Sequence, residues 1–232
     1  MSRARWPDST PGFPINFSFL FRYPRDLDSV PKPIGLVSTL VNAVTIAGST
    51  AVRGGAATFV TAGADLDGIH LATPGSPFKG DLGTSMRLAT RVSIDTDVTQ
   101  SWLLFGWGSA DTNWATGVPN NCIYFSKADG DAGTLKAIIR RGGANTISVT
   151  VATVVLATLL DLEIQVDYDP SAANTAEVRF LVNGAIKYRY NGTGVPDLVD
   201  VAAGFEGVLE MKAGSAAANT FTCVGIAGWQ NE

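Results

Sequence analysis

Apolar and polar side chains alternate with a period of two along most of the chain from about residue 35. The alternation is clearest at Leu162, Ile164, Val166 and Tyr168, which are separated by acidic or amide side chains. This period is typical of antiparallel strands with one buried face. Further strands are predicted near 35–47, 56–61, 68–72, 84–95, 101–107, 121–127, 134–140, 145–151, 206–213 and 220–229. No stretch shows a sustained helical period, so we predict an all-β sandwich of two antiparallel sheets.

A β-hairpin is predicted around Asn183-Gly184. A two-residue loop would place Phe180 opposite Lys187 and mix apolar and polar side chains on one face. A three-residue loop would place Phe180 opposite Ile186 instead. Because a slip of one residue turns every side chain of a strand to the other face, the core register favours the longer loop. We expect positive φ at the glycine, and burial of Phe180 and Tyr188.

The first 34 residues differ from the rest. They hold six of the eleven prolines, which are excluded from helix interiors and central strands. We predict an extended arm over 1–34 and a β-sandwich domain over 35–232. The arm docks on its own body or on a partner, since termini are usually ordered only when tied down. Its aromatic side chains, the expected contacts, are Trp6, Phe13, Phe17, Phe19, Phe21 and Tyr23.

Composition and charge exclude several classes of protein. The chain is 46% hydrophobic and 16% charged, which excludes disorder for its bulk. The net charge of −4 argues against nucleic-acid binding. No apolar run approaches the roughly 20 residues that a membrane span needs, so we expect no membrane contact. Cys122 and Cys223 are too few for a disulfide framework, and we expect buried free thiols.

Four segments together resemble a known family. They are Trp102 to Trp107, Asn121 to Lys127, Leu162 to Asp169 and Val178 to Gly184. In this order they resemble the concanavalin A-like (laminin G-like) jelly roll, in the form carried by structural proteins of tailed bacteriophage virions. The resemblance covers roughly residues 84–229 and implies a jelly-roll sandwich. Members of this family bind sugars, hydrolyse them, decorate capsids or form tail components, so the fold does not choose among these functions.

No catalytic constellation is evident. His70, the single histidine, lies in a strand-like setting without a neighbouring nucleophile motif, and we expect a satisfied or exposed strand histidine. Related glycosidases carry alternating carboxylates on one strand. Asp161 and Glu163 fit that pattern, but Gln165 stands where a third carboxylate should be. We therefore expect no enzyme, no catalytic residue and no cofactor.

Calcium and sugar sites are two further possibilities. Aspartate pairs could supply calcium ligands, but aspartate is also a usual turn residue, so no metal site is predicted. The pairs are Asp65 and Asp67, Asp95 and Asp97, Asp129 and Asp131, and Asp167 and Asp169. In the loop 107–114, Trp107 and Trp114 could stack on a sugar while Asp111 and Asn113 bond its hydroxyls. Alternatively, Trp107 closes the core and Trp114 packs on a neighbouring subunit.

The favoured function is that of a phage virion structural protein. We expect a capsid decoration (cement) protein that binds the major capsid protein or other virion proteins across capsomer boundaries. It would be a homo-oligomer, with a trimer favoured, located in the virion and assembled in the host cytoplasm. The alternative is a tail-associated carbohydrate-binding module that uses the loop 107–114 on a host-surface glycan. A glycoside hydrolase is the third candidate.

Overall fold

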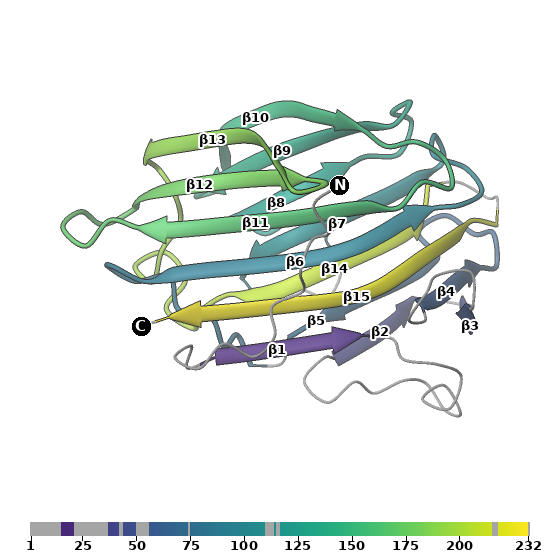
Figure 1. Cartoon of the computed structure of the whole chain (residues 1–232), viewed down its shortest axis with the longest axis horizontal. Coiled ribbons are helices and arrows are strands. Elements are labelled where there is room, and N and C mark those ends of the chain that lie inside the picture. The colour runs from purple at the N-terminus through teal and green to yellow at the C-terminus, as the bar shows by residue number, and fades with distance from the viewer. Residues whose placement is uncertain are drawn as a thin grey trace.

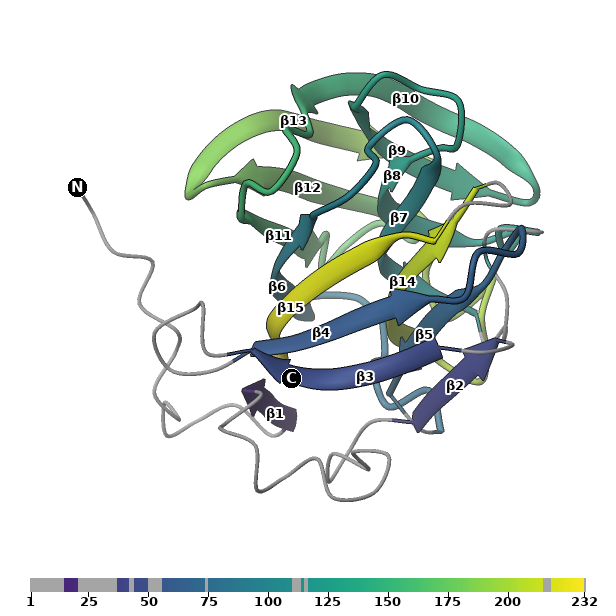
Figure 2. The same ribbon diagram turned by 90° about the vertical axis from the view of Figure 1, so that its right-hand side faces the viewer.

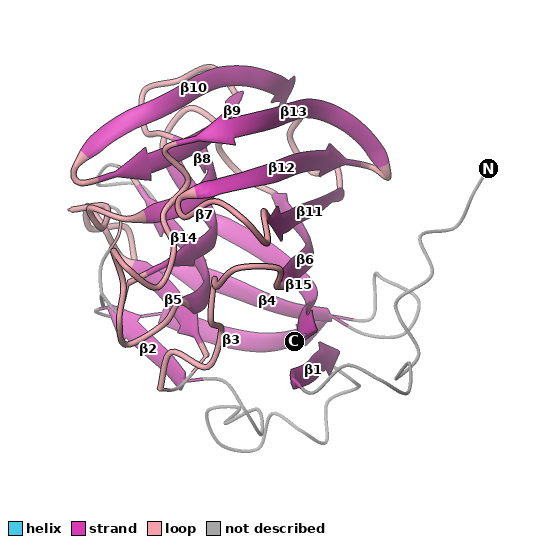
Figure 3. Ribbon diagram, turned by 90° about the vertical axis from the view of Figure 1, so that its left-hand side faces the viewer, coloured by secondary structure: helices cyan, strands magenta, loops and turns pink. Residues whose placement is uncertain are grey.

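The computed structural model describes residues 15–20, 37–41, 44–49, 56–73, 75–109, 114, 117–214 and 218–231. Within these ranges the chain forms fifteen β-strands and no helix, so none of the described segments is a helix that could cross a membrane. The strands form two antiparallel sheets that lie face to face (Figure 1). The two end-on views show them as separate curved layers (Figures 2 and 3). The predicted fold class is confirmed.

Eight strands form the first sheet, sheet A. Its order is β13 (Ala185–Thr193), β12 (Thr175–Val182), β11 (Leu160–Tyr168), β6 (Ser85–Ile94), β15 (Thr220–Asn231), β4 (Ala56–Thr61) and β3 (Val44–Ser49), with β1 (Ile15–Leu20) paired to β15. Seven strands form sheet B. Its order is β10 (Ala144–Thr153), β9 (Thr134–Arg141), β8 (Cys122–Lys127), β7 (Ser101–Gly108), β14 (Glu206–Ala213), β5 (Gly68–Ala72) and β2 (Val37–Val41).

The main core lies between the sheets. Alternate side chains of each central strand enter it, so β11 is buried at every second position. Phe125 of sheet B and Phe180 of sheet A meet there edge to face, with ring centroids 5.2 Å apart. Burying a side chain of this size contributes about 1.5–3 kcal/mol. The period of two read from the sequence is therefore the direct record of this core.

The stretch predicted as one strand near 35–47 contains two strands in different sheets. β2 pairs with β5 in sheet B, whereas β3 pairs with β4 in sheet A. Residues 42–43 between them lie outside the described residues. The predicted single strand is wrong. Alternation of apolar and polar side chains indicates that one face of a strand is buried, but it does not indicate which sheet the strand joins, so β2 and β3 could not be told apart.

The β12–β13 hairpin also differs from the predicted register. Its loop has two residues, Asn183 and Gly184, with φ of 53° and 76°, as a type I′ turn requires. A β-bulge within the strand then places Phe180 opposite Tyr188, not opposite Ile186. Phe180 is buried, Tyr188 is half-buried and Ile186 is 48% exposed. The positive φ of the glycine is confirmed, but the bulge in β13, not a longer loop, restores the core face.

Part of the predicted arm belongs to sheet A. Residues Ile15–Leu20 form β1, which pairs antiparallel with the C-terminal half of β15, so that Ile15 lies opposite Gln230. The other half of β15 pairs with β4, and β1 therefore continues the line of β4 along the same edge. Pro14 and Pro24 flank the proline-free stretch that holds this strand. The backbone of β1 docks on the chain's own body, and the division at residue 34 stays a prediction.

Candidate functional site

An open pocket lies at one end of the sandwich, where connections from both sheets meet. It measures about 400 Å³, within the range of pockets that bind small ligands. The β9–β10 turn, the start of β10 and the β13–β14 connection form its wall. The lining residues are Arg141, Gly142, Ala144, Asn145, Thr146, Gly194 and Asp200. We call it the Arg141–Asp200 pocket.

A tight turn fixes one wall of the pocket. Gly142 and Gly143 connect β9 to β10 with φ of 57° and 84°. Glycine adopts these angles without strain, and two positive values are characteristic of a type I′ hairpin. The Gly142 N–H donates to Asn121 Oδ1 at 2.8 Å, and the Gly143 N–H donates to the Asn120 carbonyl at 3.0 Å. These bonds hold the end of β9, and with it Arg141, beside the connection that leads into β8.

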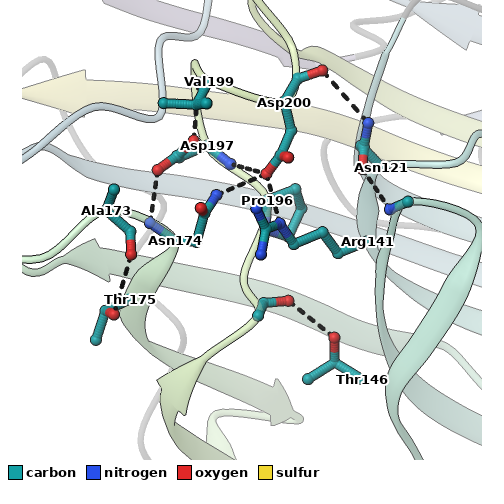
Figure 4. A network of polar contacts seen from close by, with 12 residues as sticks. Asn121, Arg141, Thr146, Ala173, Asn174, Thr175, Pro196, Asp197, Val199 and Asp200 are labelled. Atoms are coloured by element: carbon teal, nitrogen blue, oxygen red, sulfur yellow. Dashed lines mark hydrogen bonds and ion pairs between the residues drawn. The ribbon is translucent and has the colours of Figure 1, made fainter.

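Asp200 is the centre of the polar network at this end (Figure 4). Its Oδ2 accepts hydrogen bonds from Arg141 Nε at 2.9 Å and from Asn174 Nδ2 at 2.6 Å. The bond to Asp200 raises the pKa of the Arg141 guanidinium, which therefore stays charged. Among the described residues, nothing bonds Asp200 Oδ1 or the two Arg141 amino groups. The Arg141 side chain is 38% exposed and that of Asp200 is 17% exposed, so a ligand can reach both.

Asp197 fixes the backbone of the β13–β14 connection through hydrogen bonds. It is 5% exposed, and its two oxygens accept the backbone N–H groups of Asn174 at 2.6 Å and Val199 at 2.8 Å. The Tyr168 hydroxyl donates to the Pro196 carbonyl at 2.8 Å, and burial raises the pKa of this phenol. Asp197 thus shapes the loop that presents Asp200.

A second cluster of polar side chains is buried on the outer face of sheet B. Nδ1 of His70 on β5 lies 2.7 Å from Oε2 of Glu210 on β14, and Lys212 Nζ lies 3.1 Å from Oε1. The Trp114 N–H also donates to Glu210 at 3.0 Å. His70 is 3% exposed, and the other two side chains of the ionic cluster are fully buried. His70 is therefore a buried strand histidine whose Nδ1 has a hydrogen-bond partner.

The two tryptophans of the alternative glycan site are buried. Trp107 lies in the main core and packs edge-on against Phe78, with ring centroids 6.0 Å apart. Trp114 packs against Tyr124 on the outer face of sheet B, with ring centroids 5.9 Å apart. Gly108 makes room for it, since a Cβ there would lie 2.6 Å from the Trp114 ring. Neither ring offers a face to solvent, and Trp107 closes the core as the alternative interpretation expected.

Asp161 and Glu163 do not line the pocket. Asp161 and Glu163 lie on the outer face of sheet A, where Asp161 pairs with Arg91 and Glu163 accepts from Gln165 Nε2 at 2.7 Å. Among the described residues, no three His, Cys, Asp or Glu side chains could together hold a metal ion. Phe17 and Phe19 fall within β1. The candidates outside the described residues are Trp6, Phe13, Phe21, Tyr23, Asp111 and Asn113.

Comparison with known proteins shows the fold. No family model matches the sequence, and no curated protein matches it. The carbohydrate recognition domain of Emp47p is similar in structure, with a TM-score of 0.56 and 11% identity over 86% of this chain and 90% of that chain. An endo-β-1,4-glucuronan lyase from the fungus Trichoderma reesei has a TM-score of 0.58 and 9% identity, covering 92% and 94%. A carbohydrate esterase from the Shiga toxin-encoding bacteriophage phi24B has a TM-score of 0.51 and 13% identity, covering 85% and 91%.

The fold is a concanavalin A-like jelly roll. Its crossovers explain why sequence reasoning missed the pocket: Arg141 and Asp200 are far apart in the chain and meet only because β10 and β13 form neighbouring edges of the two sheets. In the sequence, the Gly142-Gly143 dipeptide indicated a turn, but it did not indicate that this turn faces the β13–β14 connection. The two aspartates that follow Pro196, Asp197 and Asp200, were the other sequence feature that indicated a polar loop.

Proposed function

We propose that this jelly roll is a carbohydrate-binding module that holds a saccharide in the Arg141–Asp200 pocket without transforming it. The observation that supports this most is an open pocket in which a carboxylate oxygen and guanidinium amino groups have no partner among the described residues. Sugar hydroxyls donate and accept hydrogen bonds, so they complement both groups. Similarity to a carbohydrate recognition domain, and to enzymes named for carbohydrate substrates, supports the same class of ligand.

The acidic groups at this end favour binding over hydrolysis. A glycosidase uses two carboxyl groups that flank one bond of the substrate. Asp200 is the one acidic residue in the pocket lining. The nearby Asp197 is buried, and both of its oxygens already accept backbone hydrogen bonds. We therefore propose binding without turnover.

A bulky substitution in the pocket wall tests this function. Ala144 is exposed and lines the pocket, so Ala144→Trp should fill it and abolish glycan binding on an array. The matched control is Ser148→Trp, because Ser148 is exposed on the same strand but lies outside the lining. Wild type and the control should bind the same glycans. If wild type binds no glycan, or Ala144→Trp binds as well as wild type, the proposal fails.

We propose that such a module works in a phage virion, on the tail. The likeness to a bacteriophage carbohydrate esterase supports this setting, and the glycan would then belong to the host surface. Binding by each module can be weak in this setting, because many copies on one particle multiply the attachment.

Capsid decoration is a second candidate. Val155 and Leu156, adjacent in the β10–β11 connection, are 55% and 48% exposed, and neighbouring exposed apolar side chains are typical of protein contacts. They lie at the end opposite the pocket, because β10 runs from one to the other. In this proposal a homo-oligomer, with a trimer favoured, binds the major capsid protein through this tip and the N-terminal arm.

Co-sedimentation with capsids tests the second candidate. The double variant Val155→Ser/Leu156→Ser should lose attachment. Leu82→Ser, at a residue that is 51% exposed in a different connection, should keep it. Light scattering gives the oligomeric state of each variant. Full attachment by the double variant, or no attachment by wild type, would remove this candidate.

A further inference from the structure

Two carboxylates lie in or beside the Arg141–Asp200 pocket. Arg141 and Asp200 are the charged residues of its lining, and they form an ion pair. Asp197 lies directly behind, with its backbone nitrogen 3.4 Å from Asp200 Oδ2. At neutral pH these three side chains carry formal charges of +1, −1 and −1. Arg140, opposite Asn145 in the β9–β10 pairing, adds a second positive charge at this end, so selectivity would come from the Asp200 carboxylate beside Arg141 and not from net charge.

The geometry of Arg141 also disfavours an acidic ligand. Arginine binds a carboxylate best through two parallel N–H groups. In this pocket Nε is already committed to Asp200, so an incoming carboxylate must use the amino groups alone. It would then lie next to Asp200 Oδ1, an acceptor to which a carboxylate can donate nothing, and like charges about 4 Å apart repel by about 1 kcal/mol in water, which is about fivefold in affinity.

Uncharged hydroxyls fit the same groups. One hydroxyl can donate to Asp200 Oδ1 and accept from an Arg141 amino group, and neither atom has a partner among the described residues. The exposed Asn145 side chain adds a donor and an acceptor that form no hydrogen bond within the described residues. The Thr146 hydroxyl is already committed to the Gly194 carbonyl at 2.8 Å. A pair of neighbouring sugar hydroxyls could bridge Asp200, Arg141 and Asn145.

We propose that the pocket selects uncharged saccharides and rejects saccharides that carry a carboxylate, such as uronates. This inference rests on the proposed function, because it names the chemical class of the saccharide bound at that pocket. The selectivity comes from charge, so it should depend on salt: repulsion of an acidic sugar is screened as ionic strength rises, whereas binding of a neutral sugar is not.

The experiment compares matched saccharides that differ only at C6 of each sugar, which is a hydroxymethyl group in the neutral member and a carboxylate in the acidic member. Galactose and galacturonate oligosaccharides, and glucose and glucuronate oligosaccharides, are titrated into the protein by calorimetry. In at least one of these pairs wild type should bind the neutral member at least about fivefold more tightly at low salt, with a smaller ratio at high salt. Equal or tighter binding of the acidic members, or a ratio that does not respond to salt, would overturn the inference and leave the proposed function standing.

Charge variants at Asn145 make the test specific to the pocket. Asn145→Lys should shift the ratio of acidic to neutral affinity about fivefold toward the acidic member, whatever the loss of the Asn145 amide costs both members. Asn145→Asp should weaken acidic binding further. Ser148→Lys adds the same charge to the same strand outside the lining and should leave the ratio unchanged. Equal responses to Asn145→Lys and Ser148→Lys would contradict the inference, and failure to bind any saccharide of either class would remove the proposed function with it.

Discussion

Single residues with unusual backbone angles hold the turns that shape this molecule. Gly184 has φ of 76°, and a Cβ placed there would meet no atom within 4 Å. The cost of a side chain at this position is therefore conformational and not steric. Gly117 also has open space around it, but its φ is not in the left-handed region. The two glycines form a matched pair.

Gly184→Val should lower the free energy of unfolding by about 1–2 kcal/mol, because a β-branched residue is strained at positive φ. Urea denaturation measures this loss. Gly117→Val should change the unfolding free energy by less than about 0.5 kcal/mol. If both variants lose the same amount, the backbone account of the turn is wrong.

The buried ionic cluster gives a second prediction at this scale. Glu210→Gln removes the carboxylate that faces the His70 ring and the Lys212 amino group, both of which stay buried. Breaking a buried pair by removing one partner costs about 3–5 kcal/mol, and denaturation should show a loss of that order. Glu163→Gln, at a half-buried surface position, should cost less than about 1 kcal/mol and alter no activity. A small loss for Glu210→Gln would mean that the cluster does not stabilise the fold.

The two thiols should be inert in the folded protein. Burial raises the pKa of Cys122 strongly and that of Cys223 to about 12. The thiolate is the reactive form, so neither cysteine should react with a disulfide reagent at neutral pH until the chain is unfolded. Both should react in concentrated guanidinium chloride. Rapid modification of the native protein would contradict the burial of these residues.

At the scale of strands, the sequence predicts where a strand lies in the chain better than it predicts which strand pairs with it. The alternation at Leu162 to Tyr168 locates β11 because burial of one face leaves a period of two. Sheet membership leaves no such mark, which is why the stretch 35–47 reads as one strand although β2 and β3 join different sheets. The register of Phe180 with Tyr188 depends on a bulge that alternation alone does not reveal. The pocket was hidden for the same reason, since its walls meet only through sheet topology.

The pairing of β1 with β15 predicts the outcome of two truncations. Deletion of 1–14 keeps β1 and serves as the control, so the contribution of β1 is the difference between the melting temperatures of the two truncations. Deletion of 1–34 removes β1 and uncovers the backbone edge of β15 over Gly225 to Gln230. That chain should still fold but melt lower, by about 2–4 °C for each kcal/mol lost, and associate through the open edge. Circular dichroism and light scattering follow the two effects, and equal melting of both truncations would contradict the role of β1.

At the scale of the whole molecule, the two polar sites differ in access. On the outer face of sheet B, Trp114 and Tyr124 pack over the strands, and the charged groups beside them are buried. The pocket at the strand ends is open, and its groups retain bonding capacity. We therefore expect saccharide recognition at the end of the sandwich and not on the sheet.

The location of a bound saccharide tests this account most directly. An isotope-labelled sample is titrated with a neutral oligosaccharide that it binds, and backbone amide chemical shifts are followed by NMR. The account predicts that the largest changes occur at Gly142, Asn145, Thr146 and Gly194, around the Arg141–Asp200 pocket. Changes confined to Leu104, Tyr124 and Ile138, on the outer face of sheet B, would contradict it.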